Sequence, residues 1–206
     1  MNQSKLQMQQ QADLSNSFEA AFKAVGGKFY RARGLAYACE QIGIIAATAK
    51  AKTAALWDTP FLRQTNLDQS LARNGVEIFW ADSNVSDAPT RKSFREKILT
   101  ADLGITQADF ALADTGTLVL LARPGQPRSA SLLPPRHIAL IRPTDLVADL
   151  DELFAALKAR GPNLQETLTS AMTFITGPSR TADIEQLLFI GVHGPLEVHA
   201  VYLETL

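Results

Sequence analysis

The stretch Ala54-Ala-Leu-Trp-Asp-Thr-Pro-Phe-Leu-Arg-Gln-Thr-Asn-Leu-Asp-Gln-Ser-Leu-Ala-Arg-Asn-Gly-Val-Glu-Ile-Phe-Trp80 contains a predicted strand, a helix and a second strand. Ala54–Trp57 is a short apolar run, which is typical of a strand buried on both faces. Asp58-Thr-Pro60 predicts the start of a helix, because proline suits the first helical turn. Asn74-Gly75 ends that helix, and Val76–Trp80 forms the next strand. This order predicts two parallel strands joined by a helix.

The same alternation continues along the chain and predicts an α/β layered fold with a largely parallel sheet. The sheet is expected to be mixed where a hairpin turns at Asp114-Thr115-Gly116. Further strands are predicted at Lys28–Arg31, Phe110–Ala113, Thr117–Leu121, His137–Ile141, Met172–Thr176, Leu187–Ile190 and Val198–Leu203. Further helices are predicted from Ser15 or Ser17 to Val25, over Leu35–Ala49, from Asp87 to a stop at Gly104, and from Thr144 or Asp145 to Leu157.

Length and composition are those of a soluble globular protein: 206 residues, 46% hydrophobic and 20% charged. We expect one domain over residues 14–206, after a glutamine-rich, disordered tail over residues 1–13. The net charge of −1 gives no basic field for nucleic acid. The tail has no apolar core of a signal peptide, and Ile42–Ala49 is too short to cross a bilayer. These features predict a cytoplasmic protein without a membrane span.

Cys39 is the only cysteine, which excludes an internal disulfide, an iron–sulfur cluster and a cysteine-rich zinc site. It lies in an apolar run and is expected to be a buried packing residue rather than a reactive thiol. His193 and His199 would be about 20 Å apart on one extended strand, too far to share a metal ion. We therefore expect this chain to bind no metal and no cofactor.

Ligands of open α/β sheets bind beyond the carboxyl ends of the strands, so the segments that follow strands are candidate sites. Gly177-Pro-Ser-Arg-Thr-Ala-Asp183 follows a strand and is predicted to lead into a helical turn at Ala182–Gln186. Such a junction attracts anions through N–H groups, and Ser179, Arg180 and Thr181 add further donors. An equally good interpretation is a capped helix start with Arg180 in a salt bridge.

Two further loops carry groups suited to acid–base chemistry. Gly191-Val-His-Gly-Pro195 holds His193 between glycines that let a ligand approach, although a lone histidine is more often structural. Asp114-Thr-Gly-Thr117 holds a carboxylate that can act as a base or nucleophile, or can simply stabilise the turn. The predicted site therefore has Asp114 and His193 as catalytic groups. Its predicted anion-binding residues are Thr115, Gly116, Thr117, Gly177, Ser179, Arg180, Thr181 and Gly194.

Four segments resemble the LUD-domain family: Asp109–Leu120, Leu132–Ile138, Gly177–Glu185 and Gly191–Pro195. The resemblance implies a three-layer α/β/α fold like that of the NagB/RpiA/CoA-transferase group. It also implies a role in oxidising L-lactate to pyruvate, together with iron–sulfur partner proteins. The family usually has glutamate at the position of Asp114, and in related transferases a glutamate near such a turn is the nucleophile.

Two function classes follow. The first is a non-redox component of an L-lactate-oxidising system, which acts with iron–sulfur partners on a small anionic ligand. The second is an independent enzyme acting on an anionic small molecule such as a phosphosugar or a CoA thioester. The second class needs a basic rim for phosphates, which Arg123, Arg128 and Arg136 are placed to supply.

Overall fold

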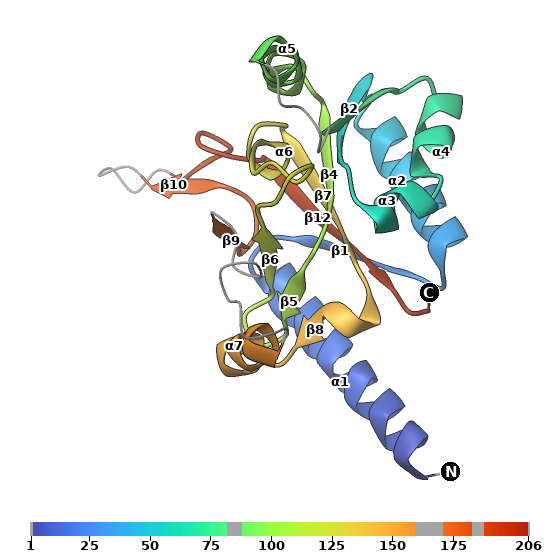
Figure 1. The fold of residues 1–206 in the computed structure, drawn as a ribbon. Helices are drawn as coiled ribbons and strands as arrows, with labels where there is room; N and C mark the ends of the chain where they lie inside the picture. Colours follow the sequence, from blue (N-terminus) through green and yellow to red (C-terminus); the bar gives the residue numbers. More distant parts are fainter. Residues whose placement is uncertain (1, 82–87, 160–170, 183–187, 206) are drawn as a thin grey trace.

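The computed structural model describes residues 2–81, 88–159, 171–182 and 188–205, and its centre is a six-stranded sheet (Figure 1). The strand order is β1-β12-β7-β4-β2-β3, and every neighbouring pair is parallel. The strands are β1 (Lys28–Ala32), β2 (Thr53–Trp57), β3 (Glu77–Ala81), β4 (Leu103–Gln107), β7 (Arg136–Ile141) and β12 (Glu197–Leu203).

The predicted strand–helix–strand unit is confirmed, with β2 and β3 paired in parallel and β2 buried from Ala54 to Trp57. Two short helices, α3 (Pro60–Gln64) and α4 (Leu67–Arg73), replace the single predicted helix. Asn66 separates them with a left-handed φ of 53°. Thr59 caps α3 by accepting a hydrogen bond from the N–H of Leu62 at 3.2 Å.

Helices α1 (Asn2–Ala24) and α2 (Leu35–Thr48) cover opposite faces of the sheet (Figure 1). Phe29 packs against Phe18 of α1, whereas the next residue of the strand, Tyr30, lies in a pocket beneath α2. Neighbouring strand residues point to opposite faces, so the sheet lies between two helical layers. This arrangement confirms the predicted α/β fold with helices on both sides of a parallel sheet. Cys39 of α2 is buried, as predicted.

Helix α1 begins at Asn2, so the prediction that it starts at Ser15 or Ser17 is wrong. Residues 2–13, predicted to be a disordered tail, belong to this helix. Part of the reason is contact with the body of the protein, because the side-chain amide of Gln11 donates to the carbonyl of Pro143 at 2.5 Å. The hydroxyl of Ser15 donates to the carbonyl of Ala12 inside the helix instead of capping it.

The hairpin at Asp114 lies outside the main sheet, which corrects the prediction that it makes that sheet mixed. It belongs to a second sheet of order β8-β5-β6-β9. These strands are β5 (Phe110–Leu112), β6 (Thr117–Leu121), β8 (Leu146–Val147) and β9 (Met172–Ile175). Helix α7 (Leu150–Ala159) starts later than predicted because β8 pairs with β5, and Asp149 accepts a hydrogen bond from the N–H of Glu152 at its first turn.

Strand β4 was not predicted, because Gly104 resembled the end of the preceding helix, α5 (Ala88–Leu99). A Cβ atom on Gly104 would lie 1.7 Å from the carbonyl oxygen of Ala130 in α6 (Ser129–Leu132). Glycine therefore lets α6 pack directly on a central strand. The remaining elements are the 3-10 helix η1 (Pro143–Asp145), β10 (Arg180–Ala182) and β11 (Leu188–Ile190). None of the described helices is long and apolar enough to span a membrane.

Candidate functional site

The three predicted loops form a chain of contacts next to the end of α1. The hydroxyls of Thr117 and Thr176 lie 2.9 Å apart, which joins the Asp114 turn to the Gly177 loop. The N–H of Ser179 donates to the carbonyl of Pro195 at 3.0 Å, which joins the Gly177 loop to the His193 loop. These contacts link the backbones of the three loops, although the His193 loop leads into the amino-terminal end of β12 rather than following a strand of the main sheet.

Among the described residues, no hydrogen bond or ion pair joins the predicted catalytic side chains, Asp114 and His193, to each other or to the predicted anion-binding Arg180. Asp114, Arg180 and His193 are all exposed. The N–H of Asp114 donates to the carbonyl of Ala148 at 3.1 Å, so its backbone has a structural partner. A shared pocket for these three side chains stays a prediction.

Arg180 does not begin a helix, which corrects the predicted strand-to-helix junction. Arg180–Ala182 is strand β10, paired with β11, so its N–H groups do not form a helix N-terminus. Beyond Ala182, the predicted helical turn lies outside the described residues. The guanidinium of Arg180 donates to the carbonyl of Val25 just after α1, a favourable place for a cation near a helix C-terminus. Anion binding by Arg180 stays a prediction.

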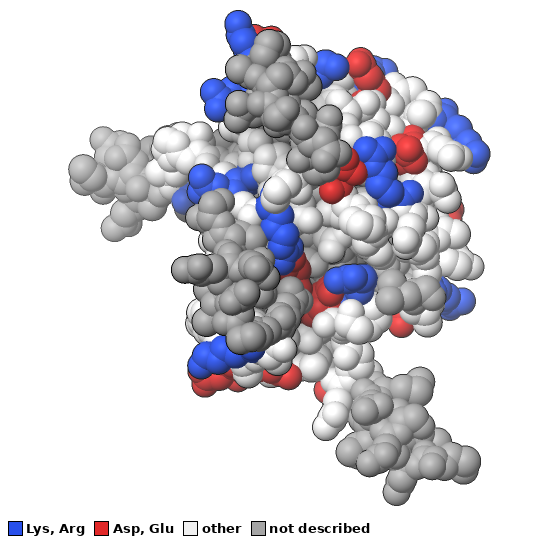
Figure 2. Space-filling view, viewed as in Figure 1, with Lys and Arg blue, Asp and Glu red and all other residues white. Residues whose placement is uncertain are grey.

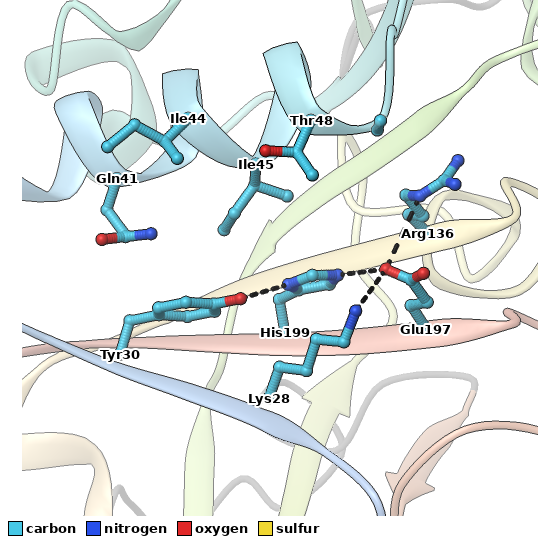
Figure 3. Close-up of a pocket in the computed structure, with 10 residues that line it drawn as sticks. Lys28, Tyr30, Gln41, Ile44, Ile45, Thr48, Arg136, Glu197 and His199 are labelled. Atoms are coloured by element: carbon cyan, nitrogen blue, oxygen red, sulfur yellow. Dashed lines mark hydrogen bonds and ion pairs between the residues drawn. The ribbon is translucent and has the colours of Figure 1, made fainter.

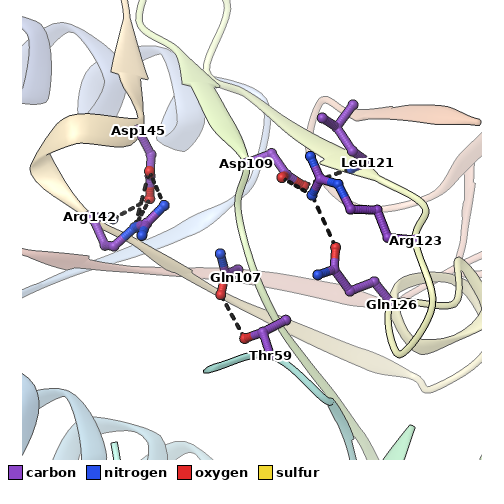
Figure 4. A network of polar contacts seen from close by, with 8 residues as sticks. All are labelled: Thr59, Gln107, Asp109, Leu121, Arg123, Gln126, Arg142 and Asp145. Atoms are coloured by element: carbon purple, nitrogen blue, oxygen red, sulfur yellow. Dashed lines mark hydrogen bonds and ion pairs between the residues drawn. The ribbon is translucent and has the colours of Figure 1, made fainter. Parts of the chain in front are cut away.

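A second group of polar residues lies where the parallel strands end, and we name it the carboxyl-edge cluster (Figure 4). Some members end or follow β2, β4 and β7 of the main sheet, at the edge where open α/β sheets bind ligands, and the others follow β6 of the second sheet. The cluster consists of Thr59, Gln107, Asp109, Arg123, Gln126, Arg142 and Asp145. Of these residues, only Arg123 was predicted from the sequence as a candidate, as part of a basic rim. Asp109 begins one of the segments that resemble the LUD-domain family, but it was not predicted as a site residue because strand β4 in front of it was not predicted.

The first ion pair of this cluster joins Asp109 to Arg123. Asp109 is 5% exposed, and its Oδ1 lies 2.6 Å from Nη1 of Arg123. Its Oδ2 accepts the N–H of Leu121 at 2.8 Å, and the same Nη1 of Arg123 also donates to Oε1 of Gln126 at 3.2 Å. The carboxylate is thus fully engaged, whereas the Arg123 side chain stays 30% exposed.

The second ion pair is a bidentate contact between Arg142 and Asp145. Nη2 of Arg142 donates to Oδ1 at 2.7 Å, and Nε donates to Oδ2 at 2.9 Å. Burial raises the pKa of Asp145, while the hydrogen bonds from Arg142 oppose that shift. The same contact raises the pKa of Arg142, so its guanidinium carries a charge at all working pH values. The nearby charge of Asp109 acts on both residues, so the two ion pairs are electrostatic neighbours.

The cluster therefore contains two partly exposed guanidinium groups, and each of them forms an ion pair with a buried carboxylate. Gln107 lies between the two ion pairs, and the Thr59 hydroxyl donates to its Oε1 at 2.7 Å (Figure 4). Figure 2 shows basic and acidic atoms side by side near the centre of this face. The pairs cancel in charge, so a ligand here would be held by directed N–H donors rather than by a net field. Planar carboxylates and phosphates match such donors.

Comparisons with known proteins agree with the motifs and the fold. The LUD domain family model matches residues 15–203. Lactate utilization protein C of Halalkalibacterium halodurans is 38% identical over 154 residues, which are 75% of this chain and 64% of that protein. The protein of the same name from Shouchella clausii is 38% identical over 147 residues, 71% of this chain and 60% of that protein. The chain thus spans less than two thirds of the length of these relatives.

A solved structure supports the fold independently. The crystal structure of a duf162 family protein from Deinococcus radiodurans superposes with a TM-score of 0.64 and 19% identity. The match covers 94% of this chain and 98% of that one, so the whole layered architecture is shared. Taken with the sequence match over residues 15–203, it shows that the chain belongs to the LUD domain family.

Proposed function

We propose that this chain is a cytoplasmic, non-redox component of a system that oxidises L-lactate to pyruvate with iron–sulfur partner proteins. The observation that carries the proposal is the 38% identity to proteins named lactate utilization protein C. A single cysteine also supports it, because a cluster needs about four thiolates and the electrons must then travel through other proteins. In this proposal the chain binds no cofactor of its own.

The carboxyl-edge cluster supplies a chemical role for such a component. Lactate and pyruvate both carry a planar carboxylate, which matches the fork of a guanidinium group. Arg123 and Arg142 are held in place by buried carboxylates, so little side-chain freedom is lost when they bind. A hydrogen bond to a charged group is worth roughly 1.5–3 kcal/mol, so each arginine contributes about one to two decades of affinity. The amide of Gln107 lies between the two ion pairs, and in this proposal it contacts the 2-oxygen of the substrate.

Lysine substitutions at the two arginines test this role, because lysine keeps the charge and loses the fork. A deletion strain is complemented with wild type, Arg123→Lys, Arg142→Lys or Arg31→Lys and grown on L-lactate as sole carbon source. We expect slow growth with the first two variants and normal growth with Arg31→Lys, whose ion pair with Glu19 lies elsewhere. Normal growth of the deletion strain would refute the role in lactate use. Normal growth of both cluster variants would show that the substrate does not depend on the forks of these two arginines.

Asp114→Asn tests the predicted catalytic turn separately. Asp114 is exposed, and its observed hydrogen bond comes from its backbone N–H, which asparagine retains. We therefore expect the melting temperature to stay within a few degrees while growth on lactate fails. His193→Ala should behave in the same way, because His193 is also exposed. Normal growth on lactate with both variants would contradict the predicted catalytic roles of Asp114 and His193.

One observation favours the alternative, an independent enzyme acting on a phosphosugar or a CoA thioester. Arg123 of the predicted basic rim does lie at the carboxyl edge. Arg136 does not lie there, because it begins β7 and is therefore at the opposite edge of the sheet. Arg128 is an exposed residue directly before α6. Turnover of a CoA thioester or phosphosugar by the purified chain alone would support the alternative over the lactate proposal.

A further inference from the structure

A pocket of about 210 Å³ lies at the other edge of the main sheet, beneath α2 (Figure 3). Its floor comes from the amino-terminal ends of three adjacent strands: Lys28 and Tyr30 of β1, Arg136 of β7, and Glu197 and His199 of β12. The other wall is α2, which contributes Gln41, Ile44, Ile45 and Thr48. The carboxyl-edge cluster follows the opposite ends of the strands, so this pocket is a separate place on the molecule.

Three nitrogen groups converge on a single oxygen of the pocket, Oε2 of Glu197. Nζ of Lys28 lies 2.9 Å from it, Nε2 of His199 lies 3.0 Å from it, and Nε of Arg136 lies 3.6 Å from it. Burial lowers the pKa of His199, so this ring is neutral at physiological pH. Two cations therefore face one carboxylate, so the three charged side chains of the pocket floor sum to +1, while Asp102 acts on Arg136 from outside the pocket lining.

The rest of the pocket has a polar side and an apolar side. The hydroxyl of Tyr30 lies 3.3 Å from Nδ1 of His199, and the two rings are stacked with an interplanar angle of 7°. On the opposite wall, Ile44 is 53% exposed and Ile45 lies beside it, so this side of the pocket is apolar. A ligand that fits both sides carries a negative charge at one end and a short apolar chain at the other.

We propose that this pocket binds a small monocarboxylate with a short aliphatic chain. Its carboxylate contacts Lys28 and Arg136, in competition with Glu197, and its chain packs on Ile44 and Ile45. Water occupies about 30 Å³ per molecule in the liquid, so the pocket holds a ligand of about six to ten non-hydrogen atoms. The proposal is independent of the role assigned to the carboxyl-edge cluster.

Butyrate, with six non-hydrogen atoms, is the probe for a titration followed by the methyl NMR signals of isoleucine. We expect saturable shifts of Ile44 and Ile45, whereas Ile105, which is buried in the middle of β4 and lines no part of the pocket, stays unchanged. Glu197→Gln removes the competing carboxylate and should tighten butyrate binding about 3- to 10-fold. Arg136→Gln and Lys28→Gln should weaken it by a similar factor. These opposite directions separate a binding role from a purely structural ion pair, whose loss would act one way only.

Glu19→Gln is the matched control, because Glu19 also pairs with one lysine and one arginine, Lys23 and Arg31, but lines no part of this pocket. It should leave the butyrate titration unchanged. Arg142→Lys should also leave the butyrate titration unchanged, because Arg142 lies at the opposite edge of the sheet. A negative result for this pocket is therefore separate from a negative result for the carboxyl-edge cluster. The proposal is overturned if wild type shows no saturable shift, or if Glu197→Gln and Lys28→Gln change affinity in the same direction. If inorganic phosphate binds with the same affinity as butyrate and does not shift the isoleucine methyl signals, the monocarboxylate assignment is overturned.

Discussion

Replacing Gly116 with alanine is expected to lower the free energy of unfolding by about 2–4 kcal/mol, through backbone strain and overpacking together. Gly116 has a φ of +63°, which alanine adopts only with strain. A Cβ atom there would also lie 2.3 Å from the backbone nitrogen of Phe22 in α1. Backbone atoms cannot rotate away as the end of a side chain can, so α1 or the turn must shift. Urea unfolding of the purified protein measures the loss.

Gly75→Ala separates the two causes, because Gly75 has a φ of +75° and nothing within 4 Å of its Cβ position. This control should lose only about 1 kcal/mol, the cost of the left-handed backbone alone. Equal losses for the two variants would mean that contact with α1 contributes nothing at Gly116. In that case the turn does not depend on its close approach to the helix.

The Gly177 loop also packs closely against the end of α1, which gives its glycine and arginine a structural role besides the predicted binding of an anion. A Cβ atom on Gly177 would lie 2.3 Å from the carbonyl oxygen of Val25, so this glycine also permits close packing at the end of α1. Arg180 donates to that same carbonyl. Glycines and an arginine in a loop can therefore serve packing, and sequence alone does not distinguish packing from ligand binding.

The sequence predicted most of the strands of the main sheet because buried parallel strands leave short apolar runs such as Ala54–Trp57. It missed β4, whose Gly104 looked like a helix stop. Only the position of α6 explains that glycine, and α6 lies 25 or more residues further along the chain. The helix start predicted at Thr144 or Asp145 failed for a similar reason, since β8 forms there by pairing with a distant strand.

The candidate site was harder to predict than the fold because its geometry depends on pairings across elements. Asp109 and Arg123 are 14 residues apart and meet only because β5 and β6 form a hairpin between them. The Arg142–Asp145 pair is local, and its spacing was visible once β7 had been placed before it. At the amino edge, Lys28, Arg136 and Glu197 come from strands 1, 7 and 12, so no spacing rule brings them together.

His137 is the residue through which we expect acid to destabilise the fold most strongly. It is completely buried in β7, and its Nε2 lies 2.9 Å from the hydroxyl of Thr106. Among the described residues, its Nδ1 has no hydrogen-bond partner. Burial, with a smaller contribution from nearby His199, lowers the pKa of His137 to about 3. An unfolded chain restores it to about 6.5, so folding excludes a proton that the unfolded state binds below that pH.

The free energy of unfolding should therefore fall as the pH drops below about 6.5, and the contribution of His137 is lost progressively down to pH 3. Between pH 6.5 and pH 5 this loss amounts to about 1.5–2 kcal/mol. Carboxylates with ordinary pKa values stay ionised in that window, so histidines dominate the slope there. His199 acts in the same direction, because burial also lowers its pKa.

Urea unfolding at a series of pH values between 5 and 7.5 measures this slope. His137→Gln keeps a side chain able to hydrogen-bond Thr106 but cannot be protonated, so its stability should change much less with pH than that of wild type. His193→Gln is the matched control, because His193 is exposed and should leave the wild-type slope intact. A His137→Gln protein that loses stability between pH 6.5 and 5 as steeply as wild type would show that His137 is not the group that acid titrates.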